Sequence, residues 1–152
     1  MPGVFKRIFL ASLLVMTCSC TPNGLKTLET IADARTHKAN FIDLGEPGDS
    51  VGDILTFDQP LRDIQGKQIG NNSGICIRTR VGEHFQCQWS LTLDDGSIQV
   101  AGREMDKGKS DIAIVGGTGQ YQGICGQMES VNNGDGTFTQ TLYYRLGSFG
   151  TD

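Results

Sequence analysis

The fold is decided by residues 50–127, a stretch that opens with SVGDILTFDQPL (50–61), continues through NSGIC (72–76) and closes with IAIVGGTGQY (112–121). Its short runs alternate apolar with polar side chains, and Gly, Asp and Asn separate the runs. Such alternation is typical of half-buried strands, and these three residue types are typical of the turns between strands. The stretch therefore predicts one strand after another, joined by short turns.

The composition is that of one globular domain. Of the 152 residues, 38% are hydrophobic, 20% are charged and 21 are glycines, which suits a turn-rich β protein. A formal net charge of −4 argues against nucleic acid as a partner, because such a chain lacks a run of phosphate contacts. The acidic residues around Pro47 are too irregularly spaced for a calcium loop, and no Cys or His pattern has zinc-ligand spacing. We therefore expect no metal and no other cofactor.

Residues 1–20 have the pattern of an export signal. A basic start at Lys6 and Arg7 precedes an apolar run over residues 8–16, which is too short to span a bilayer but suits a secretory signal. The cysteines that follow resemble a bacterial lipoprotein processing site, in which Cys20 is the favoured lipidated residue. Lipidation of Cys18 and an ordinary cleaved signal are the alternatives.

These patterns predict an exported protein, either secreted or anchored to a membrane of the bacterial envelope through the lipid. Residues 21–40 show no strand pattern. They predict a tether with at most a short helix, so the folded domain is expected to span residues 41–152.

The two strands expected at residues 75–80 and 83–93 predict their own register. If Val81 and Gly82 form a two-residue loop, then Cys76 lies directly opposite Cys87. Opposed residues have Cβ atoms about 4.5–5.5 Å apart, near the separation that a disulfide needs, and an exported protein meets an oxidising compartment. The sequence therefore predicts a Cys76–Cys87 disulfide. The same register places Trp89 on the apolar face of its strand.

About eight strands follow one another, with no helix of note. A closed sheet of this number removes exposed edges and leaves an interior wide enough for side chains or one small ligand. We therefore predict an all-β fold, an eight-stranded antiparallel barrel, with a β-sandwich as the alternative. The glycines at 116–119 predict a corner or bulge rather than a phosphate loop, because no helix with a Lys and Ser or Thr follows them.

Four motifs in this order resemble the allene oxide cyclase and dirigent superfamily, including its secreted bacterial members. They are Gly52-Asp53-x-x-x-Phe57, Gly74-Ile75-Cys76, Val100-x-Gly102 and Val115-Gly116-Gly117-Thr118-Gly119-x-Tyr121. The resemblance implies an eight-stranded barrel with a hydrophobic pocket, frequently assembled as a homotrimer. Plant cyclases of this kind close an epoxide fatty acid into a ring, and dirigent proteins steer the coupling of phenoxy radicals. Both hold a reactive ligand in one conformation.

The resemblance also implies site residues. As catalytic candidates it indicates Asp43, Asp58, Cys76 and Glu104, where Glu104 replaces a cyclase tyrosine and Cys76 is catalytic only if it is a free thiol rather than half of a disulfide. The candidates for ligand binding are Phe57, Gln59, Arg78, Trp89 and Tyr143. Arg78, together with Arg80, is also compatible with a plain solvated strand face.

Three functions follow from these observations. The leading hypothesis is an exported barrel that binds a small hydrophobic or phenolic molecule in its interior. The second is an isomerase that steers ring closure or stereoselective coupling of such a ligand. The third is a non-catalytic interaction module on the cell surface, whose barrel would be filled by side chains such as Phe57, Trp89 and Tyr143.

Overall fold

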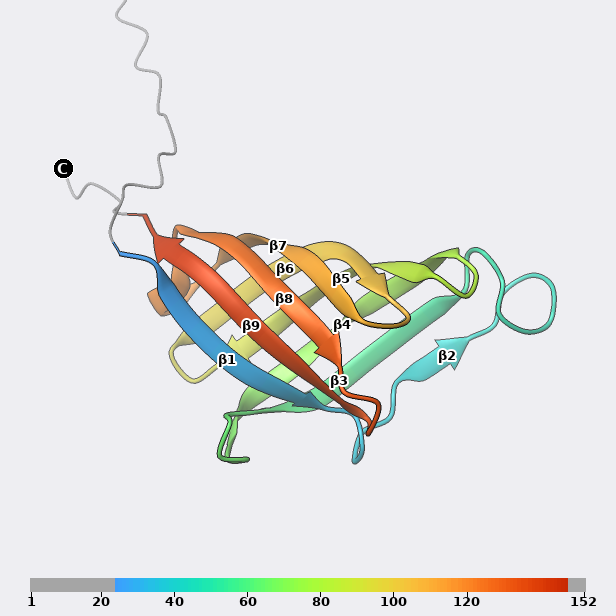
Figure 1. Ribbon diagram of the computed structural model, residues 1–152, viewed down its shortest axis with the longest axis horizontal. Helices are drawn as coiled ribbons and strands as arrows, with labels where there is room; N and C mark the ends of the chain where they lie inside the picture. The colour runs from blue at the N-terminus through green and yellow to red at the C-terminus, as the bar shows by residue number, and fades with distance from the viewer. Residues whose placement is uncertain (1–23, 148–152) are drawn as a thin grey trace, which may run out of the picture.

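The computed structural model describes residues 24–147, which form one antiparallel sheet that closes on itself (Figure 1). The strands, with one short 3-10 helix, are β1 (Lys26–Asp33), β2 (Asn40–Ile42), β3 (Ile54–Arg62), β4 (Gln68–Arg80), β5 (His84–Leu93), β6 (Gly96–Met105), β7 (Lys109–Gly117), η1 (Gly119–Tyr121), β8 (Ile124–Asn132) and β9 (Thr137–Leu146). No helix in this part of the chain is long and apolar enough to cross a membrane. The predicted export signal and Cys20 lie outside the described residues.

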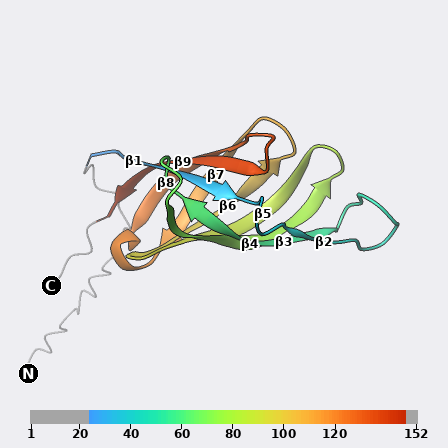
Figure 2. The ribbon, with the colours of Figure 1, turned by 90° about the horizontal axis from the view of Figure 1, so that it is seen from below.

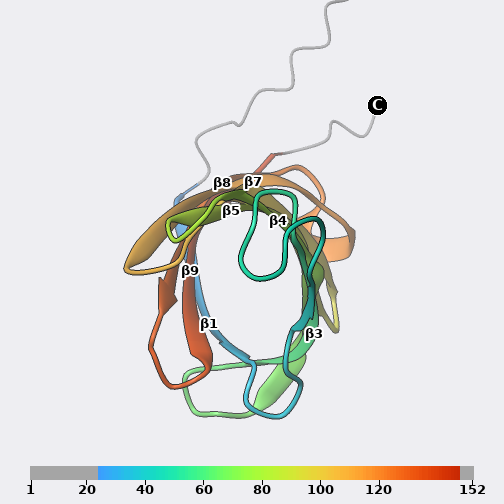
Figure 3. The same ribbon diagram turned by 90° about the vertical axis from the view of Figure 1, so that its right-hand side faces the viewer.

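The barrel is closed by β1. This strand pairs with β9 along its length and with β3 at Ile31 and Ala32. All the remaining pairs of adjacent strands in the ring are also consecutive in sequence. The remaining strand, β2, pairs with β3 and is not part of the ring. The ring is seen end-on in Figure 3. The prediction of an eight-stranded antiparallel barrel is therefore confirmed over the sandwich.

The prediction of a tether over residues 21–40 is wrong for the segment that forms β1. Its apolar residues have spacing that also suits a helix, so sequence reasoning missed the alternation of Leu28, Thr30 and Ala32 on one face. That alternation is weak because Thr30 is polar, yet Thr30 is fully buried inside the ring and its hydroxyl lies 3.4 Å from the Gln140 side-chain oxygen. The folded domain therefore begins before residue 41. Only pairing with β3 and β9, both distant in sequence, makes this segment a strand.

The predicted register of β4 and β5 is confirmed. Cys76 pairs with Cys87, their Cα atoms are 4.0 Å apart, and their sulfurs are joined in a disulfide. Next to the turn the register shifts by one residue, so Arg80 pairs with His84. Arg80 still reaches Glu83 through an ion pair of 3.0 Å. A short local loop was therefore sufficient to predict the long-range alignment of two strands.

The glycines that end β7 also behave as predicted. Gln99 of β6 pairs with Gly116 while Val100 pairs with Ile114, so one residue of β7 is left out of the ladder as a bulge. The backbone then bends into η1, and Thr118 returns a hydrogen bond to the Ser97 carbonyl oxygen at 2.8 Å. The glycines therefore shape a corner of the barrel.

The interior is divided between a packed end and a hollow end. The packed end lies towards the β3–β4 and β5–β6 turns, and its side chains are fully buried: Leu61, Leu91, Ile98, Met128 and Leu142. Tyr121 and Tyr144 meet there edge to face, with ring centroids 6.4 Å apart. The loops β1–β2, β6–β7 and β8–β9 lie at the other end, beyond which the β2–β3 loop projects (Figures 1 and 2). Packing at one end leaves the other available for a ligand.

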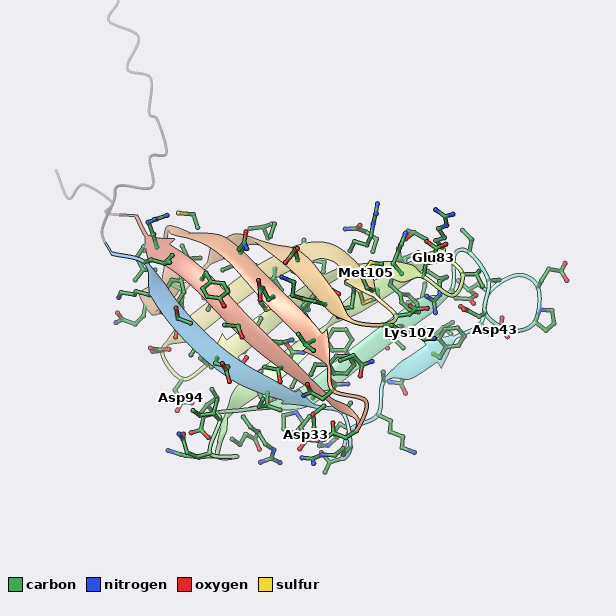
Figure 4. The ribbon with its side chains drawn as sticks, viewed as in Figure 1. Asp33, Asp43, Glu83, Asp94, Met105 and Lys107 are labelled. Atoms are coloured by element: carbon green, nitrogen blue, oxygen red, sulfur yellow. A yellow bond between two sulfur atoms is a disulfide. The ribbon has the colours of Figure 1, made fainter. Side chains whose placement is uncertain are left out.

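The seam between β1 and β3 is held by a buried carboxylate. Asp33, labelled in Figure 4, accepts hydrogen bonds from Arg35 Nε at 2.8 Å and from Arg62 Nε at 3.0 Å. These guanidinium groups, Arg35 first and Arg62 next, hold the pKa of Asp33 well below its usual range, against the opposing effect of burial. The ionised carboxylate therefore links the first barrel strand to β3.

We expect Asp33→Asn to lower the free energy of unfolding by about 1 kcal/mol at pH 7, because charge-assisted hydrogen bonds are lost. A carboxyl whose pKa is lowered by folding stabilises the fold above its unfolded pKa of about 4 and loses this contribution as pH falls further. Urea unfolding of both proteins at pH 7 and pH 3 measures the difference, which should narrow at pH 3. A difference that does not depend on pH would contradict the assigned role.

Candidate functional site

A cavity of about 460 Å³ occupies the hollow end of the barrel. Its walls come from β3, β4, β5, β6, β8 and β9, and its mouth lies among the β1–β2 and β8–β9 loops, where Ala34, Ala39 and Gly136 border it. Figure 3 looks onto this end of the molecule. Small-molecule sites typically measure about 300–1,000 Å³, so the cavity has the size of a ligand site.

One wall of the cavity is aromatic and apolar. Phe57 of β3 and Trp89 of β5 meet edge to face, with centroids 6.4 Å apart and planes at 66°, and the Cys76–Cys87 disulfide lies beside them. The backbone of β4 comes this close to Trp89 because residue 74 is a glycine: a Cβ at Gly74 would collide with the Trp89 Cβ and the Gln88 carbonyl oxygen. Phe138 of β9 adds a third aromatic ring to the lining.

The other lining residues are mostly polar, although they lie inside the barrel. Gln59 and Asn72 face each other across β3 and β4, and Ser130 and Gln140 do so across β8 and β9. All four residues are at most 4% exposed. Buried polar groups are costly unless they are hydrogen-bonded; Ser130 and Gln140 bond within the barrel to Glu104 and Thr30, whereas Asn72 Oδ1 has no partner among the described residues.

Glu104 is the one ionisable side chain among the described residues that line the cavity. Its Oε1 accepts a hydrogen bond from the Ser130 hydroxyl at 3.0 Å. Burial raises the pKa of Glu104 to about 6, while the hydroxyls of Ser130 and Ser110 act in the opposite direction. A carboxyl with this pKa can both hold and release a proton near neutral pH.

Three buried side-chain polar atoms in the described part of the chain have no hydrogen-bond partner: Asn72 Oδ1, Trp89 Nε1 and Glu104 Oε2. All three belong to residues that line the cavity. An indole N–H can only donate, and an ionised carboxylate can only accept. A ligand that fills the cavity and offers one acceptor and one or two donors would complete these bonds.

Five of the residues predicted from the sequence to be catalytic or ligand-binding lie at the cavity, namely Phe57, Gln59, Cys76, Trp89 and Glu104. For Cys76 the two alternatives are now resolved. Because its sulfur is bonded to Cys87, the residue has no thiol, and the prediction that Cys76 is catalytic is wrong. It contributes to the wall of the site instead.

Two of the predicted carboxylates lie outside the cavity. Asp43 follows β2, which is not part of the ring, and its exposed carboxylate accepts a hydrogen bond from Gly48 N at 3.0 Å (Figure 4). Asp43 is therefore not on a strand of the ring, in which β1 is the first strand along the chain. Asp58 lies on the outward face of β3, where its carboxylate is within 3.4 Å of Asn71 Nδ2. Neither residue reaches a ligand in the barrel.

Arg78 and Tyr143 are also not at the cavity. Arg78 is only 7% exposed, so the expectation of a solvated face is wrong. Its guanidinium group binds Asp49 at 2.7 Å and Asp106 at 2.6 Å and lies 3.6 Å from the centre of the Phe85 ring. Tyr143 lies on the outer face of β9, because its neighbours Leu142 and Tyr144 are the buried ones.

Sequence reasoning missed Asn72, Ser130, Phe138 and Gln140. The signal for the last two was present, because Phe138 and Gln140 have the same parity as the buried Leu142 and Tyr144. It was obscured because both faces of this part of β9 carry polar residues, so alternation of hydrophobicity did not distinguish inside from outside.

Fold and site together define a closed β-barrel with an internal ligand cavity. The model of the allene oxide cyclase barrel like domain matches residues 29–140, which is most of the chain. The chain belongs to this family, as its motifs indicated. Among curated proteins no match is found.

Solved structures extend the comparison. A pyocyanin demethylase is 27% identical, with a TM-score of 0.67 and coverage of 80% of this chain and 99% of that chain. A pterocarpan synthase dirigent protein is 20% identical, with a TM-score of 0.64 and coverage of 83% and 97%. The Diels–Alderase AbmU from Streptomyces koyangensis is 20% identical, with a TM-score of 0.65 and coverage of 84% and 68%. The similarity to the last two proteins concerns the fold.

Proposed function

We propose that the protein binds a small, flat aromatic molecule in the barrel cavity. The observation that carries this proposal is the set of unpaired polar atoms, Asn72 Oδ1, Trp89 Nε1 and Glu104 Oε2, inside a cavity with aromatic walls. Aromatic rings pack well against Phe57 and Trp89, and polar substituents on the ligand would supply the missing hydrogen bonds. A filled barrel that serves as a cell-surface interaction module would not leave a space of about 460 Å³.

The similarity to a pyocyanin demethylase supports the same ligand class. The match covers 99% of the length of that protein, and pyocyanin is a flat, tricyclic phenazine. Ligands bound by carboxylate pairing, such as fatty acids, fit less well because the described cavity lining contains no Lys, Arg or His. Pyocyanin is therefore a suitable first probe.

A second candidate function is acid–base catalysis on the bound molecule, such as ring closure or isomerisation. It is favoured by Glu104, whose pKa of about 6 and unpaired Oε2 suit a proton transfer to or from a ligand. The cavity would contribute by holding the ligand in one reactive conformation. Neither Asp43 nor Asp58 lines the cavity, so Glu104 is the residue that we assign to this step.

Binding is tested by the fluorescence of Trp89, the single tryptophan of the chain. We expect pyocyanin to quench it saturably and equilibrium dialysis to report the same affinity. Ser130→Leu, which places a larger side chain beside Glu104, should weaken binding by about 10-fold or more. The control Val131→Leu introduces leucine on the outward side of β8 and should leave binding unchanged. The absence of saturable binding of pyocyanin and of simple phenols would overturn the proposal.

We also retain three proposals about location and assembly: export of the chain, lipidation of Cys20 and a homotrimer. Export and lipidation rest on the basic and apolar pattern before Cys20, and the trimer rests on the family resemblance. Native mass spectrometry of protein purified from its own envelope tests them together. A monomer with an unmodified, uncleaved N-terminus would overturn all three.

A further inference from the structure

The charge of the cavity limits which aromatic molecules it can hold, provided that the proposed ligand binding is correct. Glu104 is ionisable, and the described lining residues include no basic side chain to balance it. A carboxylate in an apolar space is costly unless a cation or strong donor meets it. Above its pKa of about 6, Glu104 therefore makes the empty cavity electronegative.

The inward-facing cation of β4 does not supply the missing charge. Arg78 has the same parity as Asn72 and Cys76, and it is buried, but its guanidinium group is bound by Asp49 and Asp106 at 2.7 and 2.6 Å. These two carboxylates, from the β2–β3 loop and the β6–β7 loop, more than balance its charge. Arg78 is also absent from the cavity lining. An anionic ligand would therefore meet Glu104 without a basic partner.

The aromatic wall also favours a positively charged ligand. The faces of Phe57, Trp89 and Phe138 are the electron-rich parts of their rings, and cations are attracted to such faces by energies that increase when water is excluded. Glu104 Oε2 is buried and has no hydrogen-bond partner among the described residues, so its charge stays unbalanced until a positive group comes next to it. Both parts of the cavity, the carboxylate and the rings, thus select for positive charge.

We propose that the cavity is selective for aromatic cations, with the positive ring nitrogen or a protonated amine placed against Glu104 Oε2 and the flat ring system against Phe57 and Trp89. The site should bind a cationic heteroaromatic more tightly than its neutral analogue and should reject an analogue that carries a carboxylate. This selectivity goes beyond the binding of aromatic molecules in general, because it assigns the charge of the ligand.

Three probes of nearly equal shape test the inference: N-methylphenazinium, phenazine and phenazine-1-carboxylate. Their affinities are measured by equilibrium dialysis at pH 8, where Glu104 is ionised, for the wild type and for Glu104→Gln and Glu129→Gln. Glu129 is the matched control, because its carboxylate lies next to Ser130 in the chain but binds Lys109 at 2.8 Å and is not part of the lining.

We expect the wild type to bind the cation about 10-fold or more tightly than neutral phenazine, because its charge is attracted to the Glu104 carboxylate and to the aromatic faces in a cavity with little water, and to bind the carboxylate weakest. Glu104→Gln should abolish the preference while retaining phenazine binding, which also shows that the variant is folded. Glu129→Gln should behave as the wild type.

Each other outcome counts against the inference. If phenazine binds as tightly as the cation, or if Glu104→Gln keeps the preference, the selectivity for cations is refuted and the proposed binding of aromatic molecules stands. If phenazine-1-carboxylate binds best, the cavity selects for negative charge and the inference is wrong. If none of the three probes binds, the inference fails together with the proposed function.

Discussion

Replacing Cys76 and Cys87 by serine is expected to lower the free energy of unfolding by about 3 kcal/mol, the largest loss that we predict. The disulfide joins residues 11 positions apart, and a cross-link that closes a loop of this length restricts the unfolded chain by about that amount. Both sulfurs are also buried, with the residues 4% and 3% exposed, so neither can be removed without disturbing the cavity wall. Urea unfolding of the wild type and the double variant measures the loss.

The single variants are the control for this prediction. One substitution already breaks the cross-link, so Cys76→Ser or Cys87→Ser alone should cost nearly as much as the pair, and the two effects should be strongly non-additive. Thr92→Ser, on the outward side of β5, should change stability little. Two single effects that sum to the double effect would show that local packing, and not the cross-link, stabilises the hairpin.

The second large effect has the opposite sign. Glu104→Gln is expected to raise the free energy of unfolding by about 2 kcal/mol at pH 8, because each unit of pKa shift corresponds to about 1.4 kcal/mol. Folding raises the pKa of this carboxyl from 4.5 to about 6, so the ionised form is less favourable in the barrel than in the unfolded chain. The amide keeps the size of the side chain without the buried charge.

The pH dependence follows from the same shift. Below pH 4.5 the carboxyl is protonated in both states and its penalty disappears, and the penalty grows as pH rises to about 6. The advantage of Glu104→Gln should therefore be present at pH 8 and vanish near pH 4. Thermal or urea unfolding at the two pH values tests this, with Glu129→Gln as the control. If Glu104→Gln is the less stable protein at pH 8, the carboxylate is held by interactions stronger than its bond to Ser130.

The two predictions together separate the parts of the site. We expect the disulfide, which forms part of the cavity wall, to stabilise the barrel, and we expect Glu104, whose Oε2 is unpaired among the described residues, to lower its stability. Residues that cost stability are common where function requires them. A carboxylate that destabilises the empty protein, and that a bound cation would neutralise, fits a role in ligand binding.

Fold and site could be predicted from the sequence where local rules apply. The turn expected at 81–82 predicted the alignment of Cys76 with Cys87, which holds although the register shifts by one residue beside the turn, and alternation along β5 placed Trp89 inside the barrel. In the same way, the glycines after Val115 indicated the bulge of β7. Each of these predictions depends on strand periodicity and on a turn a few residues away.

Only the tertiary structure decided the rest. Residues 26–33 have no strong strand pattern and become β1 because β3 and β9 offer free edges to them. Arg78 is buried because Asp49 and Asp106, 29 and 28 residues away, converge on it. The pKa of Glu104 and the cavity beside it depend on burial by strands from the whole barrel. The sequence by itself determined most of the strands after β1 and how neighbouring ones align, since both are local. Closure of the ring decided which side chains share an interior, because burial and charge depend on residues that only the closed barrel brings together.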